Sequence, residues 1–426
     1  MKGLWWQVAE AGGARFYSLS MVMFSLFFTA RALGPEGQGM LAAALAWVSL
    51  FASFSGFSLG QVTQFRAQQR MGEVWLSEAL GNLLVLGGGL TVVAWVTAGG
   101  VFFISNGVVF KGIPNSVIAL AFVMLPFLLW EDFGNNLLMA VGRLRSYNLA
   151  QVIGRTLALF GTLLLVVWLR IGIRGALIAQ LSGQVAVALF GLAVLWRASN
   201  GFVRVSKKEL TLMFKGGVKL HLNTLGAFLL AQTSILVLNQ FRTKAEVGQY
   251  QLAYQLMATL LIVPQAASTV FFSRMAELGP DQLWPEQKRM GIQVLLLMLI
   301  FGIFAYFLAP WIIPILAGKH FNPAVRVFRL LLPSVLGMSL AQLMAPQWIG
   351  RGAFLATTTV TIITALFNVI ANILLVPRYG LIGAIWASWG CYLGVAVVFQ
   401  LGFGCWCEGR YQRHLALSAT EPLGQD

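Results

Sequence analysis

Residues 172–179 read GIRGALIA, and residues 380–387, 208 positions later, read GLIGAIWA. Two further matches have nearly the same spacing: Gly142-Arg143 recurs as Gly350-Arg351, and the set Arg31, Gly37, Gln38, Leu41 and Ala42 recurs as Arg242, Gly248, Gln249, Leu252 and Ala253. Three separate matches near half the chain length indicate that the chain consists of two related halves.

The composition indicates a membrane protein. Hydrophobic residues make up 58% of the 426 residues and charged residues 10%, whereas soluble domains average roughly 45–50% and about 25%. So few charges cannot cover so much apolar surface, which excludes a soluble enzyme, a secreted module and a disordered chain. Because one membrane span takes ~20 residues, the chain has room for about a dozen spans, and we predict an all-α polytopic membrane protein.

Apolar runs, bounded by charged residues or by Gly and Pro, give the expected helices. Twelve are predicted, at residues 14–33, 40–63, 79–104, 115–140, 148–169, 174–196, 217–240, 248–272, 291–317, 327–350, 353–376 and 381–405. The longest polar connection is RASNGFVRVSKKELTLMFKG. We therefore predict an N-terminal six-helix bundle over 1–196, a cytoplasmic linker over 197–216, a C-terminal six-helix bundle over 217–407 and a cytoplasmic tail over 408–426.

The number of helices per half sets the symmetry. Since six is even, both halves cross the membrane in the same direction, which gives a parallel repeat with a cleft between two bundles, as in transporters. Of the 29 Lys and Arg residues, 18 fall on the side of the N-terminus and 10 on the other, with Arg155 inside a span. The positive-inside rule then places both termini in the cytoplasm.

Charge, cysteine and motif content exclude several functions. The net charge of +15 lies mostly between apolar runs, where it sets topology and contacts membrane lipids rather than nucleic acid. The three cysteines form no C-x-x-C, so no metal and no cofactor are expected. The chain has no GxxxxGK[ST] motif for ATP and no long outer loop for an external active site, so we expect a protein that is not an enzyme.

Three stretches resemble one family. Residues 31–60 (RALGPEGQGMLAAALAWVSLFASFSGFSLG), 247–278 (VGQYQLAYQLMATLLIVPQAASTVFFSRMAEL) and 367–388 (FNVIANILLVPRYGLIGAIWAS) are similar to the signature helices of the Wzx-type O-antigen and exopolysaccharide flippases. These belong to the multidrug/oligosaccharidyl-lipid/polysaccharide superfamily, so the resemblance implies a MATE-like fold.

The resemblance also implies a function and partners. The function is the export of undecaprenyl-diphosphate-linked oligosaccharides from the inner to the outer leaflet of a bacterial inner membrane, for the synthesis of O-antigen, capsule or exopolysaccharide. The partners are this lipid-linked substrate and components of polysaccharide polymerisation or export. The alternatives are a drug/cation antiporter of the same superfamily and a scaffold of a synthesis complex. Antiporters of the superfamily typically need a carboxylate in helices 1–3, and the predicted spans contain none there.

Arg155 is the first candidate site residue, because a cation inside a span costs roughly 2.5–3.5 kcal/mol and needs a reason. The helix hairpin that turns near residue 144 places Asp132, and with it Glu131, at a similar depth. Two roles for Arg155 follow. It forms a structural ion pair with these acids, or it faces the central cavity and binds phosphate, with the acids modulating its affinity.

The remaining candidates lie at the ends and inside of the helices. Arg15, Lys219 and His221 lie near the cytoplasmic ends of equivalent helices, either as topogenic residues or as a cationic funnel for a diphosphate. Amides at span depth either bond between helices or line a cavity for sugar hydroxyls; the possible glycan contacts are Gln232, Gln265 and Asn368.

Overall fold

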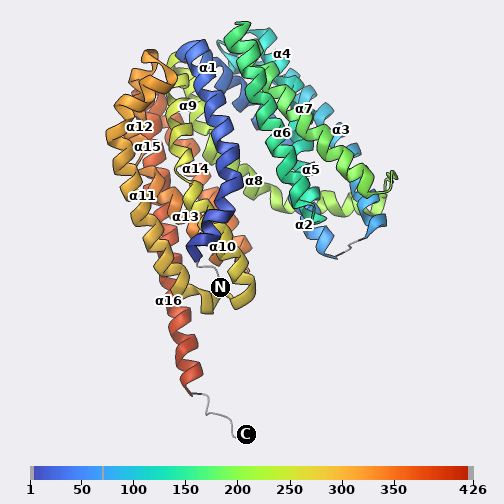
Figure 1. Cartoon of the computed structure of the whole chain (residues 1–426), viewed down its shortest axis with the longest axis vertical. Coiled ribbons are helices and arrows are strands. Elements are labelled where there is room, and N and C mark those ends of the chain that lie inside the picture. Colours follow the sequence, from blue (N-terminus) through green and yellow to red (C-terminus); the bar gives the residue numbers. More distant parts are fainter. Residues whose placement is uncertain (1–3, 70–71, 421–426) are drawn as a thin grey trace. The chain divides into compact units, whose positions relative to one another are not determined.

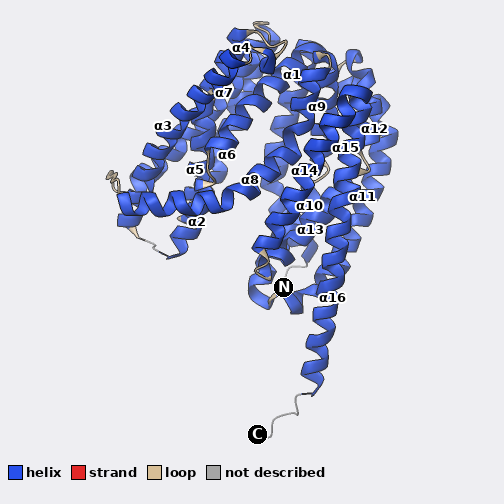
Figure 2. Ribbon diagram, turned by 180° about the vertical axis from the view of Figure 1, so that it is seen from behind, coloured by secondary structure: helices blue, strands red, loops and turns tan. Residues whose placement is uncertain are grey.

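The structure is a computed structural model that describes residues 4–69 and 72–420, with side chains described between residues 17 and 413 except at 68, 70, 71, 73 and 276. Within these residues every regular element is a helix (Figures 1 and 2). The α-helices are α1 (Leu4–Ser55), α2 (Leu59–Gln69), α3 (Glu73–Ile104), α4 (Asn115–Val123), α5 (Leu125–Ala140), α6 (Leu144–Thr162), α7 (Ile173–Ala198), α8 (Lys207–Phe241), α9 (Lys244–Thr259), α10 (Ile262–Leu278), α11 (Pro280–Ala317), α12 (Asn322–Leu331), α13 (Ser334–Gly350), α14 (Phe354–Tyr379), α15 (Leu381–Trp389) and α16 (Val397–Thr420). Short 3-10 turns cover Val108–Phe110 and Lys319–Phe321, and π-helical turns cover Leu163–Trp168 and Gly390–Ala396.

Helix α1 is two helices joined at Gly34, whose φ of 66° and ψ of 180° are not helical. Tyr17 and Ser25 make hydrogen bonds with Thr156 and Thr162 of α6, respectively. Because the residue numbers rise together, the first part of α1 runs parallel to α6.

The second part of α1 runs the other way. Trp47 packs edge-on against Phe110 and Phe51 against Phe122, with ring centroids 5.3 and 5.4 Å apart, so this part follows the direction of α4 and α5. A three-residue turn at 141–143 joins α5 to α6, and the two helices are therefore antiparallel. The chain reverses at Gly34, and α1 contains two spans.

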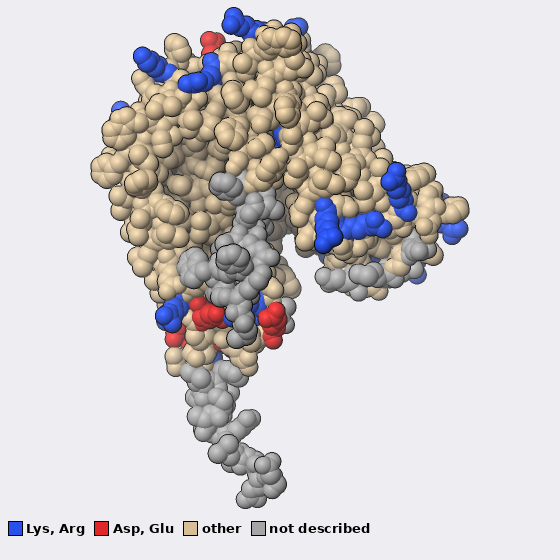
Figure 3. Space-filling view, viewed as in Figure 1, with Lys and Arg blue, Asp and Glu red and all other residues tan. Residues whose placement is uncertain are grey.

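The membrane spans agree with the prediction from the sequence. Among the described residues, nine helices are long and apolar enough to cross a membrane, or up to eleven if each of two bent pairs, α9–α10 and α12–α13, counts as one span. Counting the two parts of α1 separately raises the total to twelve. On the face drawn in Figure 3, charged side chains lie mostly toward the helix ends, and the surface between them is almost free of charge.

The chain folds into two compact units. Unit N consists of Tyr17–Leu252 and Ile313–Pro323, and unit C consists of Met1–Phe16, Ala253–Ile312 and Ala324–Asp426. Helix α8 packs in unit N, although its sequence falls largely within the predicted C-terminal bundle. Helix α16 continues through most of the predicted tail. The division into six and six helices stays a prediction.

The repeated octapeptides adopt the same backbone conformation in both units. Gly172 has φ 75° and ψ −146°, and Gly380 has φ 60° and ψ −132°. A positive φ is unfavourable for residues with a side chain, so glycine is required at both positions. A helix begins directly after each glycine, and its alanines, Ala176 and Ala384, are fully buried. The internal repeat is therefore structural as well as sequential.

Small residues let the helices of unit N pack closely. A methyl group built on Gly154 of α6 would lie 2.3 Å from Val187 Cγ2 and 2.8 Å from the Gly183 carbonyl of α7. Lipid tails are as apolar as Leu, so such close van der Waals packing, rather than apolar burial, holds membrane helices together.

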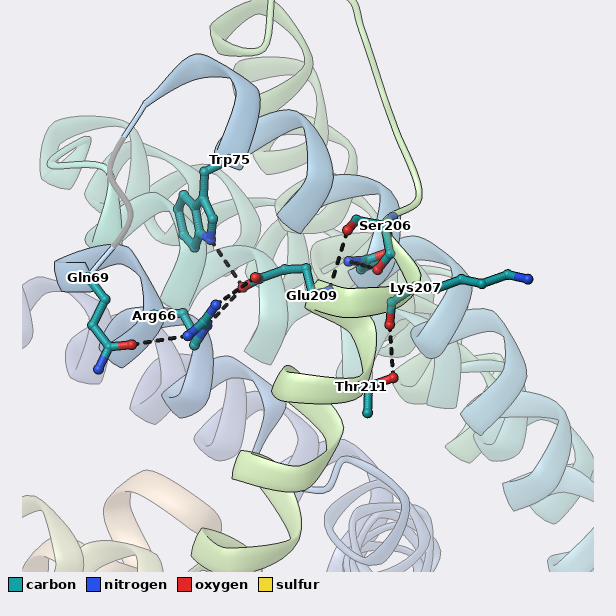
Figure 4. A network of polar contacts seen from close by, with 8 residues as sticks. Arg66, Gln69, Trp75, Ser206, Lys207, Glu209 and Thr211 are labelled. Atoms are coloured by element: carbon teal, nitrogen blue, oxygen red, sulfur yellow. Dashed lines mark hydrogen bonds and ion pairs between the residues drawn. The ribbon is translucent and has the colours of Figure 1, made fainter.

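A buried ion pair fixes α8 to α2 and α3. Arg66 Nε and Nη2 donate to the two carboxylate oxygens of Glu209 at 2.9 and 2.6 Å, and Trp75 Nε1 donates at 3.3 Å (Figure 4). The Glu209 side chain is 0% exposed and that of Arg66 is 14% exposed. The hydrogen bond to Glu209 raises the pKa of Arg66 above its ordinary value. Ser206 caps α8, because its Oγ accepts from the Glu209 amide at 3.4 Å.

Unit C contains its own buried cation, Arg351, at the end of α13. Its side chain is 4% exposed and pairs with Asp281 of α11 at 2.7 Å, while Nε donates to Gln347 Oε1 at 2.9 Å. Gln347 in turn donates to Gln287 at 2.9 Å. This network joins α11 to α13, and Trp348 stacks on Phe403 of α16 at 3.5 Å.

Candidate functional site

A short break separates α1, whose membrane-spanning part ends at Ser55, from α2, which begins at Leu59. Phe57 and Ser58, consecutive residues with side chains, have φ of 44° and 50°. Such conformations cost of order 1–3 kcal/mol each and cluster at functional sites. Transporters often build binding sites where helices are interrupted. The break therefore marks the first place to look for a site.

A pocket of about 240 Å³ opens beside this break. We call it the α1–α2 pocket, and its lining comes from four helices and the break itself: Ser49, Ala52 and Ser53 of α1, Gly56 and Ser58 of the break, Gln61 of α2, Leu128, Leu129 and Asp132 of α5, and Thr224 of α8. All these residues belong to unit N. The pocket combines four hydroxyl groups, one amide and one carboxylate with apolar wall, and convergent polar groups are what orient a ligand in a small-molecule site.

Asp132 is the one ionisable side chain in the lining of the α1–α2 pocket. Its Oδ1 accepts a hydrogen bond from Asn136 Nδ2 at 3.0 Å. A methyl group built on Gly60 would lie 2.4 Å from Asn136 Nδ2 and 2.9 Å from Asp132 Oδ2. The absence of a side chain at position 60 therefore lets this pair lie against α2, with Asp132 itself still exposed.

Helix α8 forms the opposite wall. Ser58 Oγ donates to Thr224 Oγ1 at 2.7 Å, and the ring of His221, one turn earlier, stacks on Phe57 with centroids 4.9 Å apart. His221 also has a hydrogen bond to the backbone of Phe54, while its Nδ1 is buried without a partner. These contacts support the two strained residues of the break.

Arg155 does not pair with the acids that were predicted as its partners. Among the residues the structure describes, no ion pair joins Arg155 to Glu131 or Asp132. Glu131 instead accepts from Gln151 Nε2 at 3.2 Å, and Asp132 lines the α1–α2 pocket. The sequence predicts the depth of Asp132 in the membrane but not the direction of its side chain, which depends on the rotation of α5 about its axis. That rotation directs Asp132 to the pocket wall that α5 shares with α1, α2 and α8.

The predicted cationic residues Arg155 and Lys219 lie on different helices, α6 and α8. Arg155 and Lys219 are exposed, and the described part of the chain gives neither an ion-pair partner. Arg155 shares a face of α6 with Gln151 and Thr162, because spacings of four and seven residues return to the same side of a helix. Arg15 lies in α1, but its side chain is outside the described residues.

The predicted glycan contacts have different surroundings. Gln232 of α8 and Gln265 of α10 are half-buried. Asn368 of α14 is 1% exposed, and the Asn372 amide donates to its Oδ1 at 3.3 Å and to its carbonyl at 2.9 Å. Asn368 thus has the surroundings of a packing residue, which was the alternative for these amides.

The α1–α2 pocket was missed in the sequence, although its signal is present. The stretch SLFASFSGFSLGQ (49–61) places Ser49 and Ser53 one turn apart on an otherwise apolar helix. In the part of the chain that the structure describes, no group of three or more His, Cys, Asp and Glu side chains could hold a metal ion.

Two solved structures of membrane transport proteins have a fold similar to that of this chain. The chain superposes on an inward-facing multidrug resistance MATE family transporter of the MOP superfamily with a TM-score of 0.70, covering 95% of this chain and 96% of that one at 18% identity. It superposes on lipid II flippase MurJ in an inward closed conformation with a TM-score of 0.76, covering 97% and 93% at 12% identity. At these identities the likeness shows the fold alone.

The family follows from the sequence match. Residues 13–278 match the family described as polysaccharide biosynthesis protein, and the chain belongs to this family. A relative in Haloferax volcanii, named "Probable low-salt glycan biosynthesis flippase Agl15", is 22% identical over 321 residues, or 66% of this chain. The match spans 64% of the length of that curated relative.

Proposed function

We propose that this protein is a flippase that moves lipid-linked oligosaccharides across the membrane for polysaccharide biosynthesis. The observation that carries the proposal is the family match over residues 13–278 in a chain with at least nine helices able to span a membrane in its described part. The name of the archaeal relative and the fold shared with a lipid II flippase support the same function.

The mechanism we propose is alternating access by two six-helix bundles. The lipid anchor is undecaprenyl diphosphate, the membrane is the bacterial inner membrane, and both termini are cytoplasmic. The headgroup leaves the inner leaflet while the lipid tail stays in the bilayer. The inside-negative membrane potential favours outward movement of an anion by ~2.3 kcal/mol per charge per 100 mV, which provides direction without chemical catalysis by the protein.

Arg155 and Lys219 are the phosphate-binding residues in this proposal. Both side chains are exposed on unit N and have no ion-pair partner among the described residues, so their charges are available to a ligand. A guanidinium binds a phosphate through paired, charge-assisted hydrogen bonds. Arg15 is included on its sequence position at the cytoplasmic end of the first helix.

A deletion in the native organism tests the function. We expect loss of surface polysaccharide, together with completed prenyl-diphosphate-linked oligosaccharide that stays on the cytoplasmic face of the membrane. Complementation with the wild-type gene restores both, whereas R155Q/K219Q does not, at equal amounts of protein in the membrane. The matched control is Arg145→Gln, another exposed arginine of α6, which complements fully.

Two outcomes would contradict the proposal. Unchanged glycan and lipid pools in a strain without a second flippase would refute the function, and proton-dependent efflux of cationic dyes would then favour the drug/cation antiporter. Normal surface glycan with R155Q/K219Q would leave the flippase intact and refute the role of the two cations.

A further inference from the structure

The α1–α2 pocket has the size and chemistry of a subsite for one sugar ring. Its volume of about 240 Å³ lies below the roughly 300–1,000 Å³ of pockets for drug-sized ligands. Serine and threonine hydroxyls both donate and accept hydrogen bonds, as sugar hydroxyls do. Leu128, Leu129 and Ala52 provide apolar wall against the C–H face of a ring.

We propose that this pocket binds one uncharged sugar residue of the transported glycan, with the Asp132 carboxylate accepting hydrogen bonds from two neighbouring sugar hydroxyls. The inference rests on the proposed function, because it identifies part of the substrate of that flippase. A carboxylate with two oxygens can accept from two vicinal hydroxyls at once, and such charge-assisted bonds are stronger than neutral ones.

The charge of the pocket separates the sugar from the phosphates. Asp132 repels a diphosphate, whereas Arg155 and Lys219, the residues proposed for phosphate, line no part of this pocket. The glycan and its anchor thus have separate sites on unit N. The same reasoning predicts that hexuronic acids bind more weakly than the corresponding neutral hexoses.

A dehydrated metal ion fits the lining of the α1–α2 pocket less well than a sugar does. The lining offers one carboxylate, and the residues the structure describes contain no group of three or more His, Cys, Asp and Glu side chains that could hold a metal. Six polar side chains, on α1, the break, α2, α5 and α8, surround a volume much larger than one ion. A ring with several hydroxyls can reach these scattered groups together.

The position at the helix break gives the bound sugar a structural effect. Ser58 is both a pocket residue and one of the two strained residues, and its hydroxyl bonds to Thr224 of α8. A sugar hydroxyl that bonds to both Ser58 and Thr224 joins α8 to the break. Binding of the glycan therefore strengthens the contact between α8 and the break.

Protection of an engineered cysteine tests the inference with purified full-length protein in lipid nanodiscs. Cys405 is the exposed native cysteine, and Cys391 and Cys407 are buried. Ser53→Cys in a Cys405→Ser background is labelled with a charged methanethiosulfonate reagent. D-glucose, D-galactose, D-mannose, N-acetylglucosamine and glucuronic acid are added at tens of millimolar, with sorbitol as the control for osmotic effects.

We expect at least one neutral sugar to slow labelling several-fold. Asp132→Asn raises the sugar concentration needed for protection by roughly tenfold or more, because it removes the charge from the two hydrogen bonds. Glu131→Gln is the matched control, since Glu131 is the adjacent carboxylate, bonds to Gln151 and lies outside the pocket; it leaves protection unchanged. Ser49→Cys serves as the second reporter if the first variant is not stably folded.

Labelling that no sugar slows, in both reporter variants, would overturn the inference. Protection by sodium chloride and not by choline chloride or any sugar would overturn it too and assign the pocket to a cation. These results leave the proposed function in place if the deletion strain still retains its lipid-linked glycan on the cytoplasmic face. Conversely, unchanged lipid pools refute the flippase whatever the protection assay gives.

Discussion

Removing the Arg66 side chain measures how strongly the buried ion pair holds α8 in unit N. Arg66→Met keeps the aliphatic stem but removes both guanidinium hydrogen bonds from the Glu209 carboxylate, which is 0% exposed. The 3.3 Å hydrogen bond from Trp75 Nε1 remains. Breaking a buried pair by removing one partner costs about 3–5 kcal/mol, because the other charge remains buried. Glu209→Gln in the same variant removes that charge, so the double variant is more stable than Arg66→Met alone.

The assay is unfolding of the purified protein in mixed micelles, followed by far-UV circular dichroism as the fraction of denaturing detergent rises. Arg274→Met is the control. Arg274 also pairs with a glutamate, Glu286, at 2.8 Å, but the two side chains are 25% and 40% exposed, and exposed pairs contribute about 0–1 kcal/mol. If Arg66→Met destabilises the protein no more than Arg274→Met does, the account of a buried pair that fixes α8 is wrong.

Two further substitutions test packing. Gly154→Ala places a methyl group 2.3 Å from the Val187 side chain and should lower stability by about 1–3 kcal/mol through overpacking. Gly99→Ala is the control, because no atom lies within 4 Å of its added methyl group, and it should leave stability unchanged. Equal thermal stability of the two variants would refute the close approach of α6 and α7. Asn368→Leu removes a buried amide that bonds to Asn372 and should lower stability by about 1 kcal/mol. Glycan selectivity in the complementation assay should stay unchanged. Altered selectivity at full stability would instead indicate that Asn368 contacts the glycan.

The fold could be predicted from the sequence because its signals are local. Apolar runs of span length identify helices wherever they occur, and the paired glycines at 172 and 380 require the same unusual backbone in each half. The break at Gly34 was predicted as the end of one helix and the start of another, and the structure confirms it. The packing of α8 in unit N could not be predicted, because the sequence does not show that Glu209, at the end of the linker, is buried against Arg66.

The candidate site was less accessible to prediction for a physical reason. The depth of a residue in the membrane can be estimated by counting residues from the turn of a hairpin, and this predicts that Asp132 lies near Arg155. The direction of a side chain depends on the rotation of its helix, which packing against neighbouring helices determines. The break at Phe57 and Ser58 has no proline and no local sequence that requires positive φ, so tertiary contacts with His221 and Thr224 impose it. The pocket beside it therefore appears only in the folded chain.

The most direct test of the account is flipping by the purified protein itself. The protein is reconstituted into vesicles with lipid-linked oligosaccharide extracted from membranes of the native organism, and a membrane-impermeant glycosidase is added outside. We predict that vesicles with the protein expose nearly all the glycan to the enzyme, that protein-free vesicles expose only the outer-leaflet share, and that R155Q/K219Q behaves like the protein-free control. The account would be contradicted if folded wild-type protein exposed only the outer-leaflet glycan to the enzyme, both in vesicles with an inside-negative potential and in vesicles with an inside-positive potential.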